Sequence, residues 1–154
     1  MLLELPIVWI VTLNALGWPI IQLGLAWAWT RLPLNCLHPP RALGFETGGH
    51  FYDRSFAIRR WKDRLPDGAS WLGGGFSKAK LQQRSPEYIQ RFMVETWRGE
   101  LCHWCALAFI PLFALWNPWW ANGIIVAYAL AANLPCILVQ RYNRARMQAT
   151  LERF

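Results

Sequence analysis

The chain has 154 residues, of which 55% are hydrophobic and only 16% charged, whereas about a quarter of the residues of a soluble domain are charged. Lys and Arg outnumber Asp and Glu by 16 to 9, giving a formal net charge of +7, and 11 tryptophans are too many for a core alone. The length allows one domain, the composition excludes an ordinary soluble protein, and the tryptophans indicate a membrane interface.

The first predicted element is an apolar segment over residues 5–29 that contains no charged residue. A crossing of the bilayer needs about 20 apolar residues, so this segment is long enough with some tilt. We do not expect a signal peptide, because Glu4 stands where Lys or Arg is usual and the apolar run is too long. Asn14, Trp18 and Gln22 recur every four residues. We interpret this stripe as interhelical hydrogen bonding; the alternative is the polar wall of a substrate groove.

Residues 31–84 form a polar region with many turn-forming Pro and Gly residues. It contains too many aromatic residues for a disordered linker. Residues 54–65 can form a short helix whose Arg and Lys side chains suit a position against anionic headgroups. We therefore predict an interfacial region on the cytoplasmic face.

The remaining residues predict two long helices. The Ser-Pro-Glu sequence at 85–87 is a strong helix start, because it offers an N-cap, a proline at the first position and an acid near the positive end of the helix dipole. A long helix should follow over residues 86–116, with Pro111 as a kink. A turn at Asn117-Pro118 leads into a last spanning helix over 119–139, interrupted at Asn133 and Pro135. A basic tail, residues 140–154, ends the chain.

The cationic residues fix the predicted orientation. Twelve of the sixteen lie between residues 31 and 98, and four lie between 141 and 153. With three spans these two regions share one side, which the positive-inside rule places in the cytoplasm. The fold class predicted for residues 1–154 is therefore a single all-α integral membrane domain of about three transmembrane helices. Its N-terminus lies outside and its C-terminus inside, in the inner membrane of a bacterial cell.

Four ionisable groups lie where the second long helix enters the membrane: Glu95, Arg98, Glu100 and His103. From Leu101 to Val139, His103 is the only ionisable side chain apart from cysteine and tyrosine. At about 100° per residue, these groups fan across one side of a helix. Charge at that depth is costly and usually marks function.

Three sequence blocks carry a resemblance to a known family. They are FAIRRWKDRLPDG at 56–68, ETWRGELCHW at 95–104 and NLPCILVQRYNRAR at 133–146. Together, over about residues 45–147, they resemble the small bacterial membrane proteins of the glycosyl-4,4'-diaponeurosporenoate acyltransferase family; the first helix is similar only in character. The resemblance implies an enzyme that esterifies a sugar hydroxyl of a glycosylated C30 carotenoid with a fatty acyl group, at the cytoplasmic face.

Acyl transfer to a hydroxyl needs a base, donors for the developing oxyanion and a grip on the acyl carrier. His103 is the predicted base, because imidazole titrates near neutral pH. Glu100, three residues earlier, is predicted to orient it. Arg98 and Glu95, also three apart, are expected to pair. The alternatives are a buried structural histidine and an ion-pair network that only fixes helix packing.

The first and third blocks supply candidates for binding the acyl donor or a lipid headgroup. Arginines suit phosphate; the alternative for those of the third block is a positive-inside anchor. The candidates are Arg59, Arg60, Trp61, Lys62 and Asp63 in the first block, and Asn133, Gln140, Arg141, Tyr142, Asn143, Arg144 and Arg146 in the third. We expect no metal site, because Cys105 points away from His103 on the same helix.

The predicted function is therefore a membrane acyltransferase acting on a glycosylated carotenoid or another lipidic acceptor. We expect no tightly bound cofactor, acyl-CoA as co-substrate, contact with membrane lipids, and no nucleic acid. One alternative is a small membrane methyltransferase that uses S-adenosylmethionine. Another is a non-catalytic lipid- or pigment-binding subunit of a larger complex. Because three spans enclose little interior, a homo-oligomer or a membrane partner protein is also expected.

Overall fold

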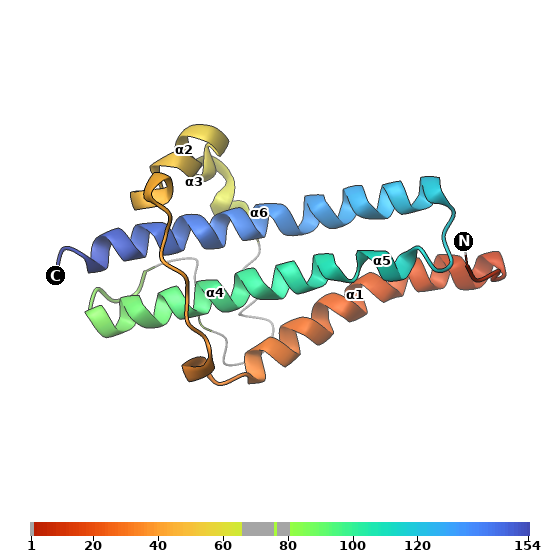
Figure 1. Ribbon diagram of the computed structural model, residues 1–154, viewed down its shortest axis with the longest axis horizontal. Coiled ribbons are helices and arrows are strands. Elements are labelled where there is room, and N and C mark those ends of the chain that lie inside the picture. The colour runs from red at the N-terminus through yellow and green to blue at the C-terminus, as the bar shows by residue number, and fades with distance from the viewer. Residues whose placement is uncertain (1, 66–75, 77–80) are drawn as a thin grey trace.

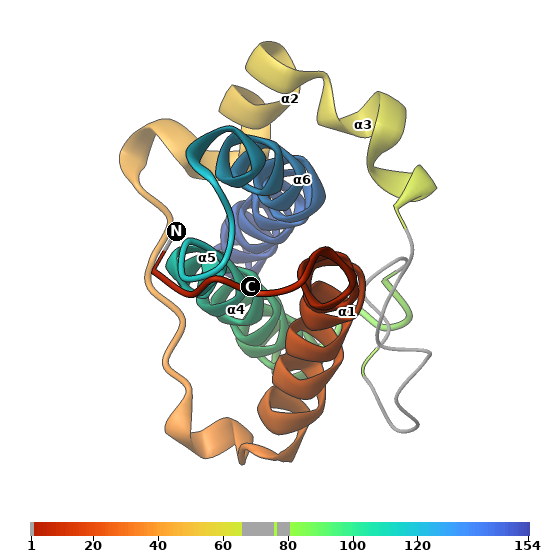
Figure 2. The same cartoon turned by 90° about the vertical axis from the view of Figure 1, so that its right-hand side faces the viewer.

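The computed structural model describes residues 2–65, 76 and 81–154. In this part of the chain every regular element is a helix, as the sequence predicts. Three long helices, α1 (Ile7–Arg31), α4 (Pro86–Ala108) and α6 (Trp119–Leu151), run side by side (Figure 1). Seen along the bundle, they stand at the corners of a triangle (Figure 2).

Shorter elements connect the long helices or cross them. The 3-10 helices η1 (Leu34–Cys36) and η2 (Gly44–Gly49) follow α1, and η3 (Lys62–Arg64) ends the first described part of the polar region. In chain order, α2 (His50–Phe56) and α3 (Ile58–Trp61) come between η2 and η3. In space they lie beside α6, on the side away from α1 and α4 (Figures 1 and 2). The chain after α1 crosses α4 to reach α6, where the Ala42 amide donates to Gln148 Oε1 at 2.6 Å. The rest of the polar region up to residue 80, apart from residue 76, lies outside the described residues.

Helix α4 begins where the sequence predicts. Ser85 caps it by accepting a hydrogen bond from the Tyr88 amide at 3.3 Å, and Pro86 opens the first turn. The predicted helix over 86–116 is divided, because α4 ends at Ala108 and α5 (Ile110–Phe113) follows. Pro111 explains the break, since it has no N–H to donate to the carbonyl four residues earlier.

Helix α6 is longer than predicted. Asn133 and Pro135, expected to interrupt it, lie inside a continuous helix, and the basic tail is helical as far as Leu151. The Asn133 side chain donates to the Ala129 carbonyl at 2.8 Å and so satisfies its own amide within the helix. The arginines of the third block are therefore held on the rigid helix that carries Asn133.

Among the described residues, α1 and α6 are long and apolar enough to cross a membrane. Only 6% of the apolar window of α1 and 17% of that of α6 is buried inside the molecule. These surfaces are the outward-facing apolar surfaces that candidate membrane spans require. The third predicted span corresponds to α4 and α5, which do not form one long apolar helix.

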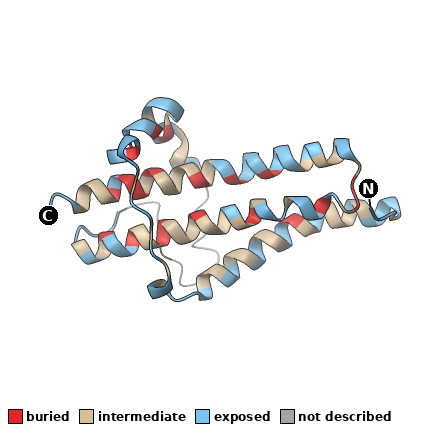
Figure 3. Cartoon of the chain, viewed as in Figure 1, coloured by how far each residue is buried: buried red, intermediate tan, exposed pale blue. Residues whose placement is uncertain are grey.

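Buried residues lie on the inner faces of the long helices (Figure 3). One apolar cluster, around Trp18 and Phe113, lies near the α5–α6 turn. Two others lie toward the opposite end of α6, one around Tyr142 and one around Met147. Buried polar residues accompany them: Glu46, Glu95, Thr96, Glu100, Asn117, Asn133 and Arg144. Most of these carry the candidate site.

Candidate active site

Glu100 is the centre of a buried ion cluster between α4 and α6. Its side chain is 4% exposed, as is that of Arg144, and Arg144 Nη2 lies 2.7 Å from Glu100 Oε2. Arg141, one turn earlier on α6, approaches Glu100 Oε1 at 3.7 Å. Trp104 Nε1 donates to the same oxygen at 3.3 Å. The face of the Trp97 ring also lies 5.2 Å from the Arg144 guanidinium.

Glu46 on η2 adds a second buried carboxylate to this cluster. Arg141 Nε lies 3.3 Å from Glu46 Oε1, so Arg141 sits between two acids. The Leu43 amide donates to Glu46 Oε2 at 2.8 Å, and the Tyr52 hydroxyl donates to Oε1. Burial and the hydrogen bond to Glu46 raise the pKa of the Tyr52 phenol, which keeps it protonated as a donor. Two arginines therefore balance two carboxylates.

Gly49 allows η2 to approach α6 closely enough for these contacts. Its φ is +75°, and a Cβ added there would lie 2.8 Å from Tyr142 Cδ2 and 2.9 Å from Arg146 Cγ. Only a residue without a side chain fits both this backbone conformation and this spacing. Glu46 reaches Arg141 because η2 packs directly on α6.

His103 is held by an amide network that joins all three long helices. Its Nδ1 lies 2.8 Å from Asn133 Oδ1 on α6, and Gln22 Nε2 on α1 donates to the same oxygen at 2.9 Å. Asn133 Nδ2 donates to Ala129 O, so Oδ1 must be the acceptor. Nδ1 of His103 therefore carries a proton, and in the neutral ring Nε2 carries the lone pair. We call Gln22, His103 and Asn133 the amide triad.

The chain is similar to known proteins over most of its length. The family model described as CrtO, glycosyl-4,4'-diaponeurosporenoate acyltransferase, matches residues 33–153. Proteins of that name from Staphylococcus aureus strains USA300, NCTC 8325 / PS 47 and MRSA252 are each 32% identical over 138 residues. These alignments cover 87% of this chain and 83% of each relative. The chain belongs to the glycosyl-4,4'-diaponeurosporenoate acyltransferase family.

No solved structure matches the chain. The family-model match begins just after α1, whereas the alignments with the relatives cover 87% of the chain and so extend into α1. The family-model match contains the buried ion cluster and both His103 and Asn133, whereas Gln22 lies before it.

The four residues predicted to be catalytic do not form one group: Glu95 pairs with Arg98, whereas Glu100 and His103 have partners on α6. The expected pair of Glu95 and Arg98 is present, with Arg98 Nη2 2.6 Å from Glu95 Oε2. The sequence predicts Glu100 as the partner of His103, whereas the structure places Asn133 at Nδ1 and directs Glu100 to arginines. One reason is that helical spacing reveals neighbours on the same helix but not those supplied by another helix.

The predicted binding residues separate into four groups. Arg141 and Arg144 join the buried ion cluster, and Asn133 joins the amide triad. Tyr142, fully buried, accepts from Arg59 Nε at 3.3 Å and from Arg146 Nη1 at 3.4 Å, which brings the first and third blocks together. The remaining candidates make only local contacts or are exposed or half-buried. Trp61 donates to Phe56 O, Lys62 pairs with Asp63, Arg60 is exposed, and Asn143 and Gln140 are half-buried.

Sequence reasoning missed Glu46 and Tyr52. It interpreted Gln22 as part of a stripe that forms interhelical hydrogen bonds, and the bond from Gln22 to Asn133 is such a bond. Glu46 had one available signal, since it is an acid directly before a Thr-Gly-Gly turn in an otherwise basic region. Its ion-pair partner Arg141, however, lies about a hundred residues later in the chain. Among the described residues, no group of three or more His, Cys, Asp or Glu side chains could hold a metal ion.

Proposed function

We propose that the protein transfers a fatty acyl group to a sugar hydroxyl of a glycosylated carotenoid, the acceptor for which its relatives are named. Family membership supports acyl transfer over methyl transfer and over a non-catalytic role. The observation that carries the chemistry is the amide triad, because it holds an imidazole in the tautomer that a general base requires.

In the proposed reaction, His103 Nε2 takes the proton of the sugar hydroxyl while that oxygen attacks the acyl carbonyl carbon. The bond from this carbon to the sulfur of the donor thioester then breaks. The imidazolium returns the proton to the leaving thiolate, so the products are an ester and a free thiol. Asn133 plays the orienting part that an acid plays in a catalytic triad, because its oxygen accepts the hydrogen bond from the Nδ1–H of His103.

The buried ion cluster is proposed to hold the phosphates of acyl-CoA as co-substrate. Glu100 and His103 lie one turn apart on α4, so the arginines that pair with Glu100 lie next to the proposed base. Arg144 Nη1 is buried and has no hydrogen-bond acceptor among the described residues. A buried guanidinium N–H without an acceptor favours an anionic ligand at this position.

We also propose that the chain is one membrane domain whose N-terminus lies outside and whose C-terminus lies in the cytoplasm. The distribution of cationic residues supports this orientation, because every Lys and Arg lies before residue 99 or after residue 140, and none lies in residues 1–30. Membrane lipids then cover α1 and α6. Assembly into a homo-oligomer or with a membrane partner protein stays a prediction.

The test is lipid mass spectrometry on a host that makes the glycosylated carotenoid. The wild-type protein should add one fatty acyl group, and His103→Ala should reduce the ester by at least about a hundredfold. His50→Ala is the matched control, since His50 is exposed on α2, away from the amide triad. A folded His103→Ala protein with wild-type turnover would refute the general-base role, and a gain of one methyl mass would indicate the methyltransferase.

The donor is tested separately by thermal stability. Acyl-CoA should raise the midpoint of unfolding of the wild-type protein, and S-adenosylmethionine should not. Arg144→Met should lose most of the shift, whereas Arg153→Met, an exposed arginine near the chain end, should keep it. An equal shift in both variants would show that Arg144 does not bind the donor.

A further inference from the structure

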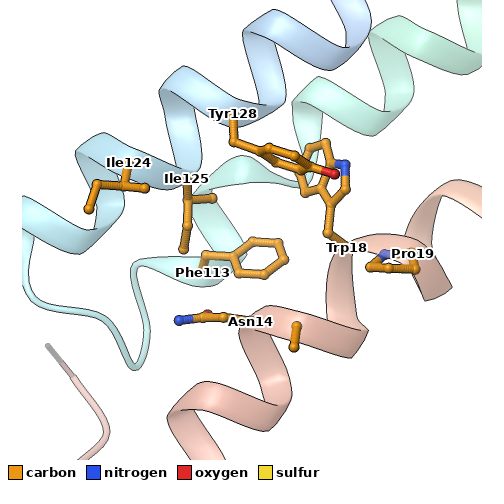
Figure 4. Close-up of a pocket in the computed structure, with 8 residues that line it drawn as sticks. Asn14, Trp18, Pro19, Phe113, Ile124, Ile125 and Tyr128 are labelled. Atoms are coloured by element: carbon orange, nitrogen blue, oxygen red, sulfur yellow. The ribbon is translucent and has the colours of Figure 1, made fainter.

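An apolar cavity lies between α1, α5 and α6. Along the bundle, it lies between the amide triad and the α5–α6 turn. Its volume is about 360 Å³. Ala15 and Trp18 on α1, Phe113 on α5, and Ile125 and Tyr128 on α6 form its walls (Figure 4). The Trp18 ring lies 5.8 Å from Phe113 and 6.1 Å from Tyr128, so aromatic faces line much of the space.

A hydrogen-bonded polar cluster lies at the end of the cavity near the α5–α6 turn. Asn14 Nδ2 donates to Asn117 Oδ1 at 2.8 Å, and Asn14 Oδ1 accepts from Trp116 Nε1 at 2.9 Å. Asn117 Nδ2 also donates to the Phe113 carbonyl at 2.9 Å. These bonds engage both the oxygen and the nitrogen of the Asn14 amide, the residue at the cavity wall, and so fix its orientation.

The other end of the cavity leads toward His103. Gln22, one turn after Trp18 on α1, bonds Asn133, which in turn bonds His103. Asn133 follows Tyr128 by five residues on α6, a rise of about 7.5 Å. An extended hydrocarbon chain whose carbonyl lies at His103 would therefore enter this space along the same two helices.

We propose that the cavity holds the methyl end of the donor's fatty acyl chain and that the polar cluster at its end sets the preferred chain length. This inference rests on the proposed function. A saturated chain can rotate about each of its C–C bonds, so it can fill a small cavity. A conjugated carotenoid is a rigid rod that needs a longer, straight channel. The volume lies near the lower end of the range for ligand sites.

The test measures which acyl chains appear in the product of a host with mixed fatty acids. Ala15→Phe fills the cavity and should shift the ester to shorter chains, with about tenfold loss in rate for each methylene that no longer fits. Ile125→Ala enlarges the cavity and should shift the ester to longer chains. Ala127→Phe is the matched control, because Ala127 is exposed on α6 and does not line the cavity; its chain distribution should equal that of the wild type.

The outcomes separate the two proposals. If the wild type forms no acyl ester, the proposed function fails and this inference falls with it. If the wild type forms the ester but neither cavity variant changes its chain lengths, the cavity does not hold the acyl chain. A uniform loss of rate together with a raised KM for the acceptor would assign the cavity to the carotenoid instead. Should Ala15→Phe fail to fold, the shift in Ile125→Ala decides.

Discussion

At the scale of single residues, several contacts between opposite charges hold the buried ion cluster together, rather than any one pair. Arg141 touches both carboxylates, so removal of either acid leaves a partly buried guanidinium with one partner. Breaking a buried pair by deleting one side is strongly destabilising, because the remaining charge stays out of water. Glu46 is the sharpest place to test this, since it lies on a separate element.

We expect Glu46→Ala to lower the free energy of unfolding by about 3 kcal/mol. Glu46→Gln should lose less, because its amide oxygen still accepts from Tyr52. Chemical denaturation in detergent micelles measures both changes. Glu152→Ala, an exposed acid near the end of the chain, should stay within about 0.5 kcal/mol of the wild type. An equal effect at both positions would show that the cluster adds no stability.

Tyr52 predicts an alkaline dependence of stability. Its folded-state pKa is raised above the ordinary value of 10.0 by burial and by the bond to Glu46. Above pH 10 the unfolded chain loses this proton while the folded chain keeps it, so stability falls as the pH rises. Tyr52→Phe should be less stable than wild type at neutral pH and should show a smaller decline above pH 10. Identical pH slopes in denaturation curves would contradict this.

At the scale of elements, the position of η2 depends on a glycine that has no room for a side chain. We expect Gly49→Ala to cost about 2 kcal/mol or more, from the positive φ and from the clash with the Tyr142 ring. It should also reduce turnover, because Glu46 and Arg141 separate. Gly44→Ala is the matched control, since nothing lies within 4 Å of the added Cβ. Equal melting temperatures for the two variants would show that η2 tolerates displacement.

The elements that the sequence predicts well are those with a local signal. Apolar run length predicts α1, and the Ser85 cap and Pro86 predict the start of α4. The continuity of α6 through Pro135 could not be predicted in this way, because a proline normally signals interruption. The packing of η2 on α6 could not be predicted either, since it depends on contacts between residues about a hundred positions apart.

The same distinction applies to the candidate site. The residue types were predictable, because an ionisable group within or directly beside an apolar run is rare, and His103 and Glu100 stand out for that reason. Their partners were not predictable. Glu100 pairs with Arg144 on another helix, and His103 meets Asn133 there; one sequence gives no register between two helices.

At the scale of the whole molecule, charge and apolar surface lie in different parts of the chain. We expect a membrane-impermeant maleimide added to intact spheroplasts to label a single cysteine introduced by Trp119→Cys at the exposed start of α6. A chain that keeps only Cys36, exposed in η1, should react only after permeabilisation. Labelling of Cys36 in intact spheroplasts would reverse the proposed orientation.

The oxygen of Asn133 that joins three helices has one further consequence. Gln22 from α1 and His103 from α4 both meet this atom, which α6 carries. A sideways displacement of any of the three helices therefore changes the surroundings of the imidazole. The geometry of the imidazole thus depends on the assembly of the bundle. A chain in which α1 has not yet packed against the other helices lacks the hydrogen bond from Gln22 to Asn133.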